Sequence, residues 1–162
     1  MSYILTLQLD TTSQAHFNNL RQLYFPPDRN YIDAHVTLFH SLPEEPPITE
    51  ALAEVAIHQT FQVAVTGLRS LGKGVAYTLE SQQLLALHRS LSTKLADYLI
   101  PQDRQRFQPH IVVQNKVTPE AAKLLLQQLR TSFTPMQIEV TGLSLWHYRN
   151  GPWEAAQIFP FS

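Results

Sequence analysis

The sequence predicts an α+β fold in which two similar halves enclose a central cleft. Segments in which every second side chain is apolar, as in a strand, are interleaved with segments that carry an apolar stripe at helical spacing. These segments follow in the same order in both halves. Equivalent residues of the halves are separated by a constant 75 positions. We therefore expect residues 1–162 to form one bilobed, pseudo-twofold domain, with two antiparallel-rich sheets lining the cleft and helices outside.

The first half is expected to begin with a strand and a helix. Asp10–Ser13 is typical of a turn that precedes a helix, and Pro26 ends that helix because proline lacks an amide donor. Phe17, Leu20 and Leu23 form its apolar stripe. The elements expected in this half are the strand Tyr3–Leu9, the helix after it, the strand His35–His40, a helix from Thr49 to about His58, and the strands Phe61–Ser70 and Val75–Glu80.

The second half is expected to run the same course. Pro101 ends its first helix, and Thr118 with Pro119 is typical of an N-cap followed by a first-turn proline. The elements expected here are the helix Gln83–Leu99, the strand Phe107–Gln114, a helix beginning after Thr118, and the strands Met136–Tyr148 and Trp153–Phe159.

Two separate blocks of sequence share the offset of 75. His35 and Val36 fall on His110 and Ile111. In the second block, Gln62, Val63, Val65, Thr66, Gly67 and Leu68 fall on Gln137, Ile138, Val140, Thr141, Gly142 and Leu143. Because chance rarely supplies one constant offset twice in a short chain, these blocks indicate a duplication.

The first block contains a histidine-apolar-threonine motif on a predicted strand. Side chains two residues apart share a strand face, so His35, Thr37 and Phe39 are expected on one face and His40 on the other. The equivalent residues of the second half are His110, Val112 and Gln114.

Pseudo-symmetry is expected to bring His35 and His110 together in the cleft. An imidazole with a pKa near 6.5 has both protonation states accessible at neutral pH. Two such rings facing one cleft suit acid–base chemistry, in which one ring takes a proton while the other gives one.

The chain resembles the two-histidine phosphoesterase superfamily, which includes the bacterial 2′-5′ RNA ligase group and the cyclic nucleotide phosphodiesterases. The segments Ala34–Phe39 and Arg106–Val113 carry the resemblance, since they match the paired His-x-Thr/Ser motifs and the usual Pro-His lead-in. The resemblance implies a bilobed, duplicated fold that acts without a metal on RNA-type phosphodiesters, with a terminal or cyclic phosphate of RNA or of a nucleotide as substrate.

The resemblance also implies roles for the motif residues. His35 and His110 share the base and acid roles, and Thr37 donates a hydrogen bond to a non-bridging phosphate oxygen. Which histidine is the base stays open at this point. The sequence departs from the family pattern at Val112, where the second motif lacks its hydroxyl. Two alternatives therefore remain: an RNA- or nucleotide-binding module with weakened chemistry, and a protein-interaction domain with a vestigial cleft.

Four further residues are candidates for substrate binding. Tyr31 and Phe39 are aromatic side chains that can stack on a base, as readers of single-stranded RNA do. Arg106 can contact a phosphate, and Gln114 is a candidate donor in place of the missing hydroxyl. Val112 itself is expected to line the substrate site.

Composition excludes several classes of protein. Twelve basic and thirteen acidic residues give a net charge of −1, which lacks the positive field of a general duplex-binding protein. The chain has no cysteine, so disulfide frameworks, thiolate nucleophiles and cysteine-bound zinc are excluded. Met1–Asp10 fits neither a signal peptide nor a membrane span. We expect a cytoplasmic monomer with no metal, no cofactor and no membrane association.

Overall fold

The computed structural model describes the whole chain, residues 1–162, as seven strands and four helices. Three short 3₁₀ turns are η1 (Pro27–Arg29), η2 (Ala96–Tyr98) and η3 (Pro101–Arg104). In chain order the strands and helices are β1 (Ser2–Leu9), α1 (Thr11–Tyr24), β2 (Thr37–Pro43), α2 (Pro46–Val55), β3 (Phe61–Ser70), β4 (Val75–Glu80), α3 (Gln82–Lys94), β5 (His110–Gln114), α4 (Pro119–Ser132), β6 (Met136–Tyr148) and β7 (Glu154–Pro160). The predicted α+β class is confirmed, and every predicted helix and strand is present.

The sheet shows the duplication directly. The strand order is β2-β1-β6-β3-β4-β5, with β7 paired to the outer part of β6. An offset of 75 relates β1 to β4, β2 to β5 and β3 to β6, so the order is the same from either end. At its centre Val63 of β3 pairs with Ile138 of β6, which is its own equivalent 75 positions later. The pseudo-twofold axis therefore passes between β3 and β6.

The two predicted sheets are joined into one continuous antiparallel sheet. The reason is the length of β6, whose 13 residues exceed the span of any one neighbour. Its first part, from Met136 to Val140, pairs with β3, and its later part pairs with β1 and β7. Each lobe consequently contains one long strand from the other half of the sequence: β6 pairs with β1, and β3 pairs with β4.

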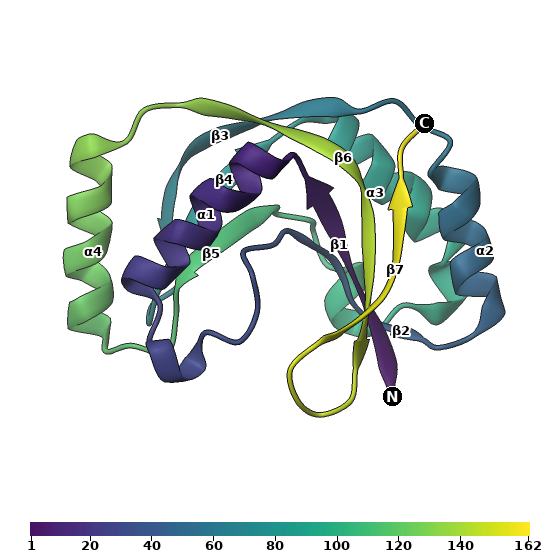
Figure 1. The fold of residues 1–162 in the computed structure, drawn as a ribbon, viewed down its shortest axis with the longest axis horizontal. Coiled ribbons are helices and arrows are strands. Elements are labelled where there is room, and N and C mark those ends of the chain that lie inside the picture. The colour runs from purple at the N-terminus through teal and green to yellow at the C-terminus, as the bar shows by residue number, and fades with distance from the viewer.

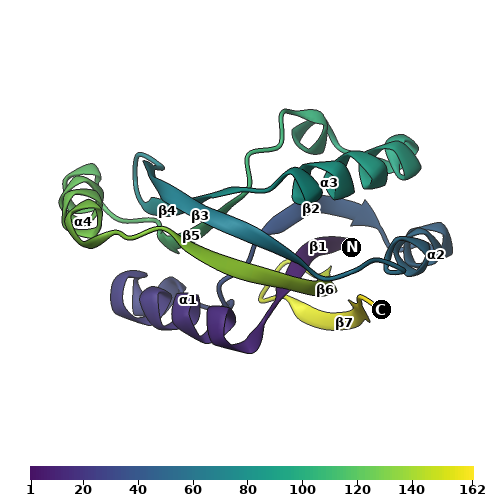
Figure 2. The ribbon, with the colours of Figure 1, turned by 90° about the horizontal axis from the view of Figure 1, so that it is seen from above.

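The helices obey the same pseudo-symmetry. Figure 1 shows β3 and β6 crossing the molecule as an arch, with α1 and α4 at one side and α2 and α3 at the other. Seen from above in Figure 2, α1 and α3 lie on opposite sides of this arch, and α2 and α4 lie at its two ends. No helix combines the length and the apolarity that crossing a bilayer requires.

Local sequence explains where the helices begin. Asp10, Ser81 and Thr118 each accept a hydrogen bond from the backbone amide three residues later, at the first turns of α1, α3 and α4. Helix α2 begins at Pro46, before the predicted Thr49, because proline is tolerated in a first turn where no amide donor is needed. Helix α3 ends at Lys94, short of the predicted Leu99, and η2 follows it.

Candidate functional site

His35 and His110 line one cleft together with Thr37 and Val112, and its volume is about 400 Å³. His110 is the first residue of β5, and His35 lies just before β2. These strands are the two ends of the main sheet order, and residues at both ends line the same cleft. The predicted meeting of the two histidines is therefore present in the fold.

The two rings are held in the same way. Nδ1 of His35 lies 2.8 Å from the carbonyl oxygen of Asp33, and Nδ1 of His110 lies 2.8 Å from that of Gln108. A carbonyl oxygen only accepts, so each Nδ1 carries the hydrogen. Because Asp33 and Gln108 are themselves 75 positions apart, the duplication has preserved the bond that orients each ring. Nε2 of each ring remains available to a ligand.

A β-bulge in each edge strand changes which residues face the cleft. Opposite β1, Leu38 is the extra residue between Thr37 and Phe39; opposite β4, Val113 is the extra residue between Val112 and Gln114. These two bulges fall on equivalent positions, and β2 has a second irregularity, between Phe39 and Leu42, for which β5 has no equivalent. Beyond each bulge the alternation of side chains between the two faces is reversed. Counting every second residue from the histidine therefore assigns the later residues to the wrong face.

The bulges contradict the placement predicted for Phe39 and Gln114. Phe39 has 0% exposure and belongs to the core, and Gln114 has 7% exposure and does not line the cleft. The Oε1 atom of Gln114 is buried without a hydrogen-bond partner. Neither side chain is positioned to stack on a base or to replace the hydroxyl that Val112 lacks.

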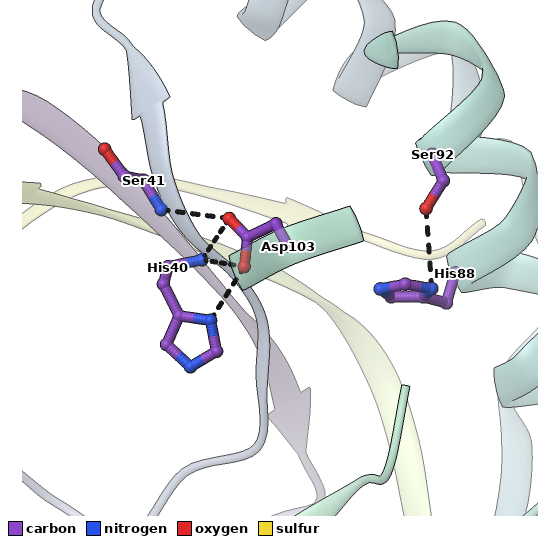
Figure 3. Close-up of polar contacts among 5 residues, drawn as sticks. All are labelled: His40, Ser41, His88, Ser92 and Asp103. Atoms are coloured by element: carbon purple, nitrogen blue, oxygen red, sulfur yellow. Dashed lines mark hydrogen bonds and ion pairs between the residues drawn. The ribbon is translucent and has the colours of Figure 1, made fainter. Parts of the chain in front are cut away.

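The same reversal brings His40 into the cleft, where parity placed it on the opposite face. Its Nδ1 lies 2.7 Å from Oδ1 of Asp103, and its backbone amide donates to both oxygens of that carboxylate. Figure 3 shows Asp103 reaching from η3 to the backbone of β2 and to the His40 ring. No sequence pattern predicted this pair, because its members are 63 positions apart.

Of the remaining candidates, Arg106 lines the cleft and Tyr31 does not. Tyr31 is 67% exposed and borders a separate small cavity beside α1. The cleft also contains side chains that sequence reasoning missed, which are Arg69, His88, Gln102, Gln105, Phe107 and Gln108. Most come from the segment between α3 and β5, which has no periodic pattern that would reveal its position.

His88 forms the middle of an aromatic stack in the wall of the cleft. Its ring lies parallel to that of Phe107 at 3.9 Å between centroids and parallel to that of Phe39 at 4.8 Å. Nδ1 of His88 lies 3.5 Å from Oγ of Ser92, one helical turn away (Figure 3). Burial lowers the pKa of His88, so the ring is neutral at neutral pH and behaves as part of an apolar stack.

Arg21 is a buried cation behind the cleft. It is 5% exposed, its guanidinium donates to the carbonyl of Val112 at 3.0 Å and to Oδ1 of Asn30 at 3.1 Å, and it lies 4.1 Å from the ring centroid of Phe25. Burial lowers the pKa of Arg21 to about 10, which leaves it charged at neutral pH. The side chain therefore ties α1 to the second histidine strand. Arg21 lies on the buried face of α1 with Ser13 and Phe17, whereas Leu23, which was expected in the apolar stripe, is 63% exposed.

The surroundings of His35 favour its neutral form. Burial lowers the pKa of His35 to about 4. The hydrogen bond to the Asp33 carbonyl opposes this lowering of the pKa, whereas the charges of Arg21, His110 and His40 contribute to it. At neutral pH the ring of His35 is thus neutral, and its Nε2 atom carries a lone pair.

Trp153 covers His35, so we expect replacement of Trp153 to change the titration of that ring. The two ring centroids are 4.8 Å apart. In a Trp153→Ala variant more of the imidazole is exposed to water, and the pKa of His35 is expected to rise from about 4 toward the ordinary value near 6.5. NMR titration of the His35 ring measures this, and Trp153→Phe, which retains an aromatic cover, is the matched control. A wild-type ring that titrates near 6.5 would contradict the expectation.

No group of three or more His, Asp or Glu side chains is arranged to hold a metal ion.

Comparison with known proteins places the chain in a family. The model of the 2′-5′ RNA ligase superfamily matches residues 9–152, which includes both histidine motifs. The chain belongs to the 2′-5′ RNA ligase superfamily. This confirms the resemblance drawn from the two motifs. No curated protein sequence matches the chain.

Solved structures share the fold of this superfamily member over nearly the whole chain. TT0787 of Thermus thermophilus has a TM-score of 0.71 at 16% identity, covering 99% of this chain and 98% of its own. Escherichia coli LigT complexed with 3′-AMP has a TM-score of 0.61 at 17% identity, with 99% and 98% covered. Usb1 of Kluyveromyces marxianus has a TM-score of 0.50 at 14% identity, with 98% and 96% covered. At such identities the likeness concerns the fold.

Proposed function

We propose that this superfamily member is a phosphodiesterase that opens 2′,3′-cyclic phosphates at RNA ends or on nucleotides, using His35 and His110 as base and acid. The observation that carries the proposal is the pair of equivalent imidazoles in one cleft, each oriented through Nδ1 and each with a free Nε2. The same arrangement suits a 2′-5′ phosphodiester, and attack by a ribose hydroxyl in place of water makes the reaction a ligation.

In the proposed reaction His35 is the general base. Its neutral Nε2 takes a proton from water as the water oxygen attacks phosphorus in line. The bond from phosphorus to the 3′ oxygen of ribose breaks, and Nε2 of His110 gives that oxygen a proton, which leaves a 2′-phosphate. The two imidazoles supply both proton transfers, so the proposed reaction requires no cofactor.

Thr37 and the cationic side chains would hold the phosphate. Thr37 lines the cleft and donates its hydroxyl to a non-bridging oxygen, which stabilises the charge that develops in the transition state. Arg69 and Arg106 border the same cleft. Among the cleft residues the one carboxylate is Asp103, whose side chain is 1% exposed and already bonded to His40, so an anionic substrate meets a net positive surface.

A second candidate function is nucleotide binding without efficient turnover, which Val112 favours. It lines the cleft at the position equivalent to Thr37 and offers no hydroxyl, and the buried Gln114 supplies no replacement. Compared with a site that has two hydroxyls, the reaction is expected to lose one charge-stabilising donor.

The proposal is tested by incubating the protein with nucleoside 2′,3′-cyclic phosphates and with short RNAs that end in a cyclic phosphate. We expect a 2′-phosphate product, which ³¹P NMR distinguishes from the 3′ isomer. Absence of product together with nucleotide-dependent thermal stabilisation would favour the binding module. Absence of both would favour a protein-interaction domain.

A further inference from the structure

A third imidazole lies in the cleft, and the reaction proposed above does not use it. His40 has a side chain that is 48% exposed, and it borders the same cavity as His35 and His110. Its Nδ1 is taken up by the Asp103 carboxylate at 2.7 Å. Nε2 is therefore the nitrogen left for a ligand.

The Asp103 carboxylate, which holds this ring, is almost completely buried. Asp103 is 1% exposed at the side chain and accepts from the backbone amides of His40 and Ser41 as well as from the His40 ring. Removing a carboxylate from water is unfavourable unless its oxygens are bonded and its charge is balanced. The backbone amides and the His40 ring bond its oxygens.

Pseudo-symmetry provides an internal comparison. The turn η1 is the equivalent of η3, and it also carries an aspartate, Asp28, at the position 75 residues before Asp103. The side chain of Asp28 is 83% exposed, and Asn115, the equivalent of His40, bonds only the amide of Lys116 through its side chain. The turn η1 thus forms without a buried carboxylate. The need to hold the turn η3 in place therefore does not explain the contact between Asp103 and His40.

His40 lies further along β2 than Thr37, the residue proposed to hold the reacting phosphate. The two are three residues apart, which is at most about 10 Å at about 3.3 Å per residue, and the bulge at Leu38 shortens that distance. The cavity of about 400 Å³ is much larger than one phosphate group, since a water molecule occupies only about 30 Å³. His40, Arg106 and Gln105 all border this cavity.

We propose that His40, positioned by Asp103, binds a second phosphate of the substrate, one nucleotide away from the phosphate that reacts. The protonated ring donates Nε2–H to a phosphate oxygen, and Asp103 balances the charge of the ring. Arg106 borders the same cleft and adds a cation. This deepens the proposed function, on which it rests, by assigning a substrate with two phosphates. The second phosphate is either a 5′-phosphate on a mononucleotide or an internal diester of RNA.

The test compares ligands that differ by one phosphate. Isothermal titration calorimetry with adenosine 3′-monophosphate and adenosine 3′,5′-bisphosphate gives the ratio of the two dissociation constants at one ionic strength. We expect the bisphosphate to bind the wild type about tenfold more tightly, as one charge-assisted hydrogen bond provides. In His40→Ala the ratio should fall to about one to two, whereas in His16→Ala, an exposed histidine on α1, it should stay as in the wild type.

Asp103→Asn tests the positioning role. Asparagine retains an oxygen for the backbone amides but has no charge to balance the ring, so the ratio of the two dissociation constants should fall. The melting temperature shows whether the contact between η3 and β2 is also weakened. A His40→Gln variant retains a donor and should keep part of the preference that His40→Ala removes. A dinucleotide with a 3′-terminal phosphate replaces the bisphosphate in a second arm, which tells an internal diester from a 5′-phosphate.

Two results would overturn the assignment: equal affinity of the wild type for the mono- and bisphosphate in both arms, or an undiminished ratio in His40→Ala. Because these measurements record binding, they remain decisive if the protein fails to open cyclic phosphates. If no cyclic phosphate is opened but the preference for the bisphosphate still depends on His40, the proposed reaction is rejected and the second phosphate site is retained.

Discussion

Replacement of either cleft histidine by alanine is expected to abolish most of the turnover. Removing a positioned acid or base reduces the rate about 10²- to 10⁴-fold, and His35→Ala and His110→Ala should both fall in this range. Initial rates on a nucleoside 2′,3′-cyclic phosphate measure the effect. The double variant should be little slower than the single variants, because the two rings act as one unit.

Neither substitution should unfold the protein. Both rings are partly exposed and bond only a nearby carbonyl through Nδ1, so the thermal transition of each variant should stay close to that of the wild type. His16→Ala, on the exposed face of α1, is the matched control for loss of an imidazole. Equal product release by the wild type and both variants would reject two-histidine catalysis.

The two hydroxyl positions are expected to respond in opposite directions. Thr37→Val removes the donor to the non-bridging oxygen and should slow turnover about 10²-fold, as loss of one oxyanion donor does in other enzymes. Val112→Thr adds the equivalent donor in the second half and should raise the rate about tenfold or more. Valine and threonine have nearly the same shape, so kcat is expected to change more than the melting temperature.

This pair also separates the two candidate functions. A weakened enzyme gains turnover from Val112→Thr, whereas a pure binding module gains affinity for nucleotides and no product. The combination of Thr37→Val with Val112→Thr shows whether the halves are interchangeable. A Val112→Thr protein with unchanged rate and unchanged affinity would mean that position 112 does not contact the phosphate.

Much of the fold could be predicted because its information is local or repeated. Alternation, apolar stripes, N-caps and prolines mark each element within a few residues of its observed bounds. The offset of 75 then relates the halves, and the paired strands β3 and β6 confirm it at Val63 and Ile138. The same offset predicted that His35 and His110 would meet in one cleft, and they do.

The errors have one physical origin. Phe39, Gln114 and His40 were assigned to faces by unbroken alternation, but each edge strand contains a bulge opposite its neighbour. A bulge depends on the register between two strands, which the strand's own sequence does not state. The bulges therefore turn Phe39 and Gln114 away from the cleft, and in the first half His40 lies in it instead.

The sequence by itself determined the class of fold, the duplication and the histidine pair, because periodicity, capping and a constant offset are properties of neighbouring or repeated residues. Only the tertiary structure decided the surroundings of that pair. Trp153 over His35, Arg21 behind Val112 and Asp103 beneath His40 all come from distant segments. Their contacts depend on how helices and turns pack against the sheet, and that packing sets the burial, charge and hydrogen bonding of each imidazole in the cleft.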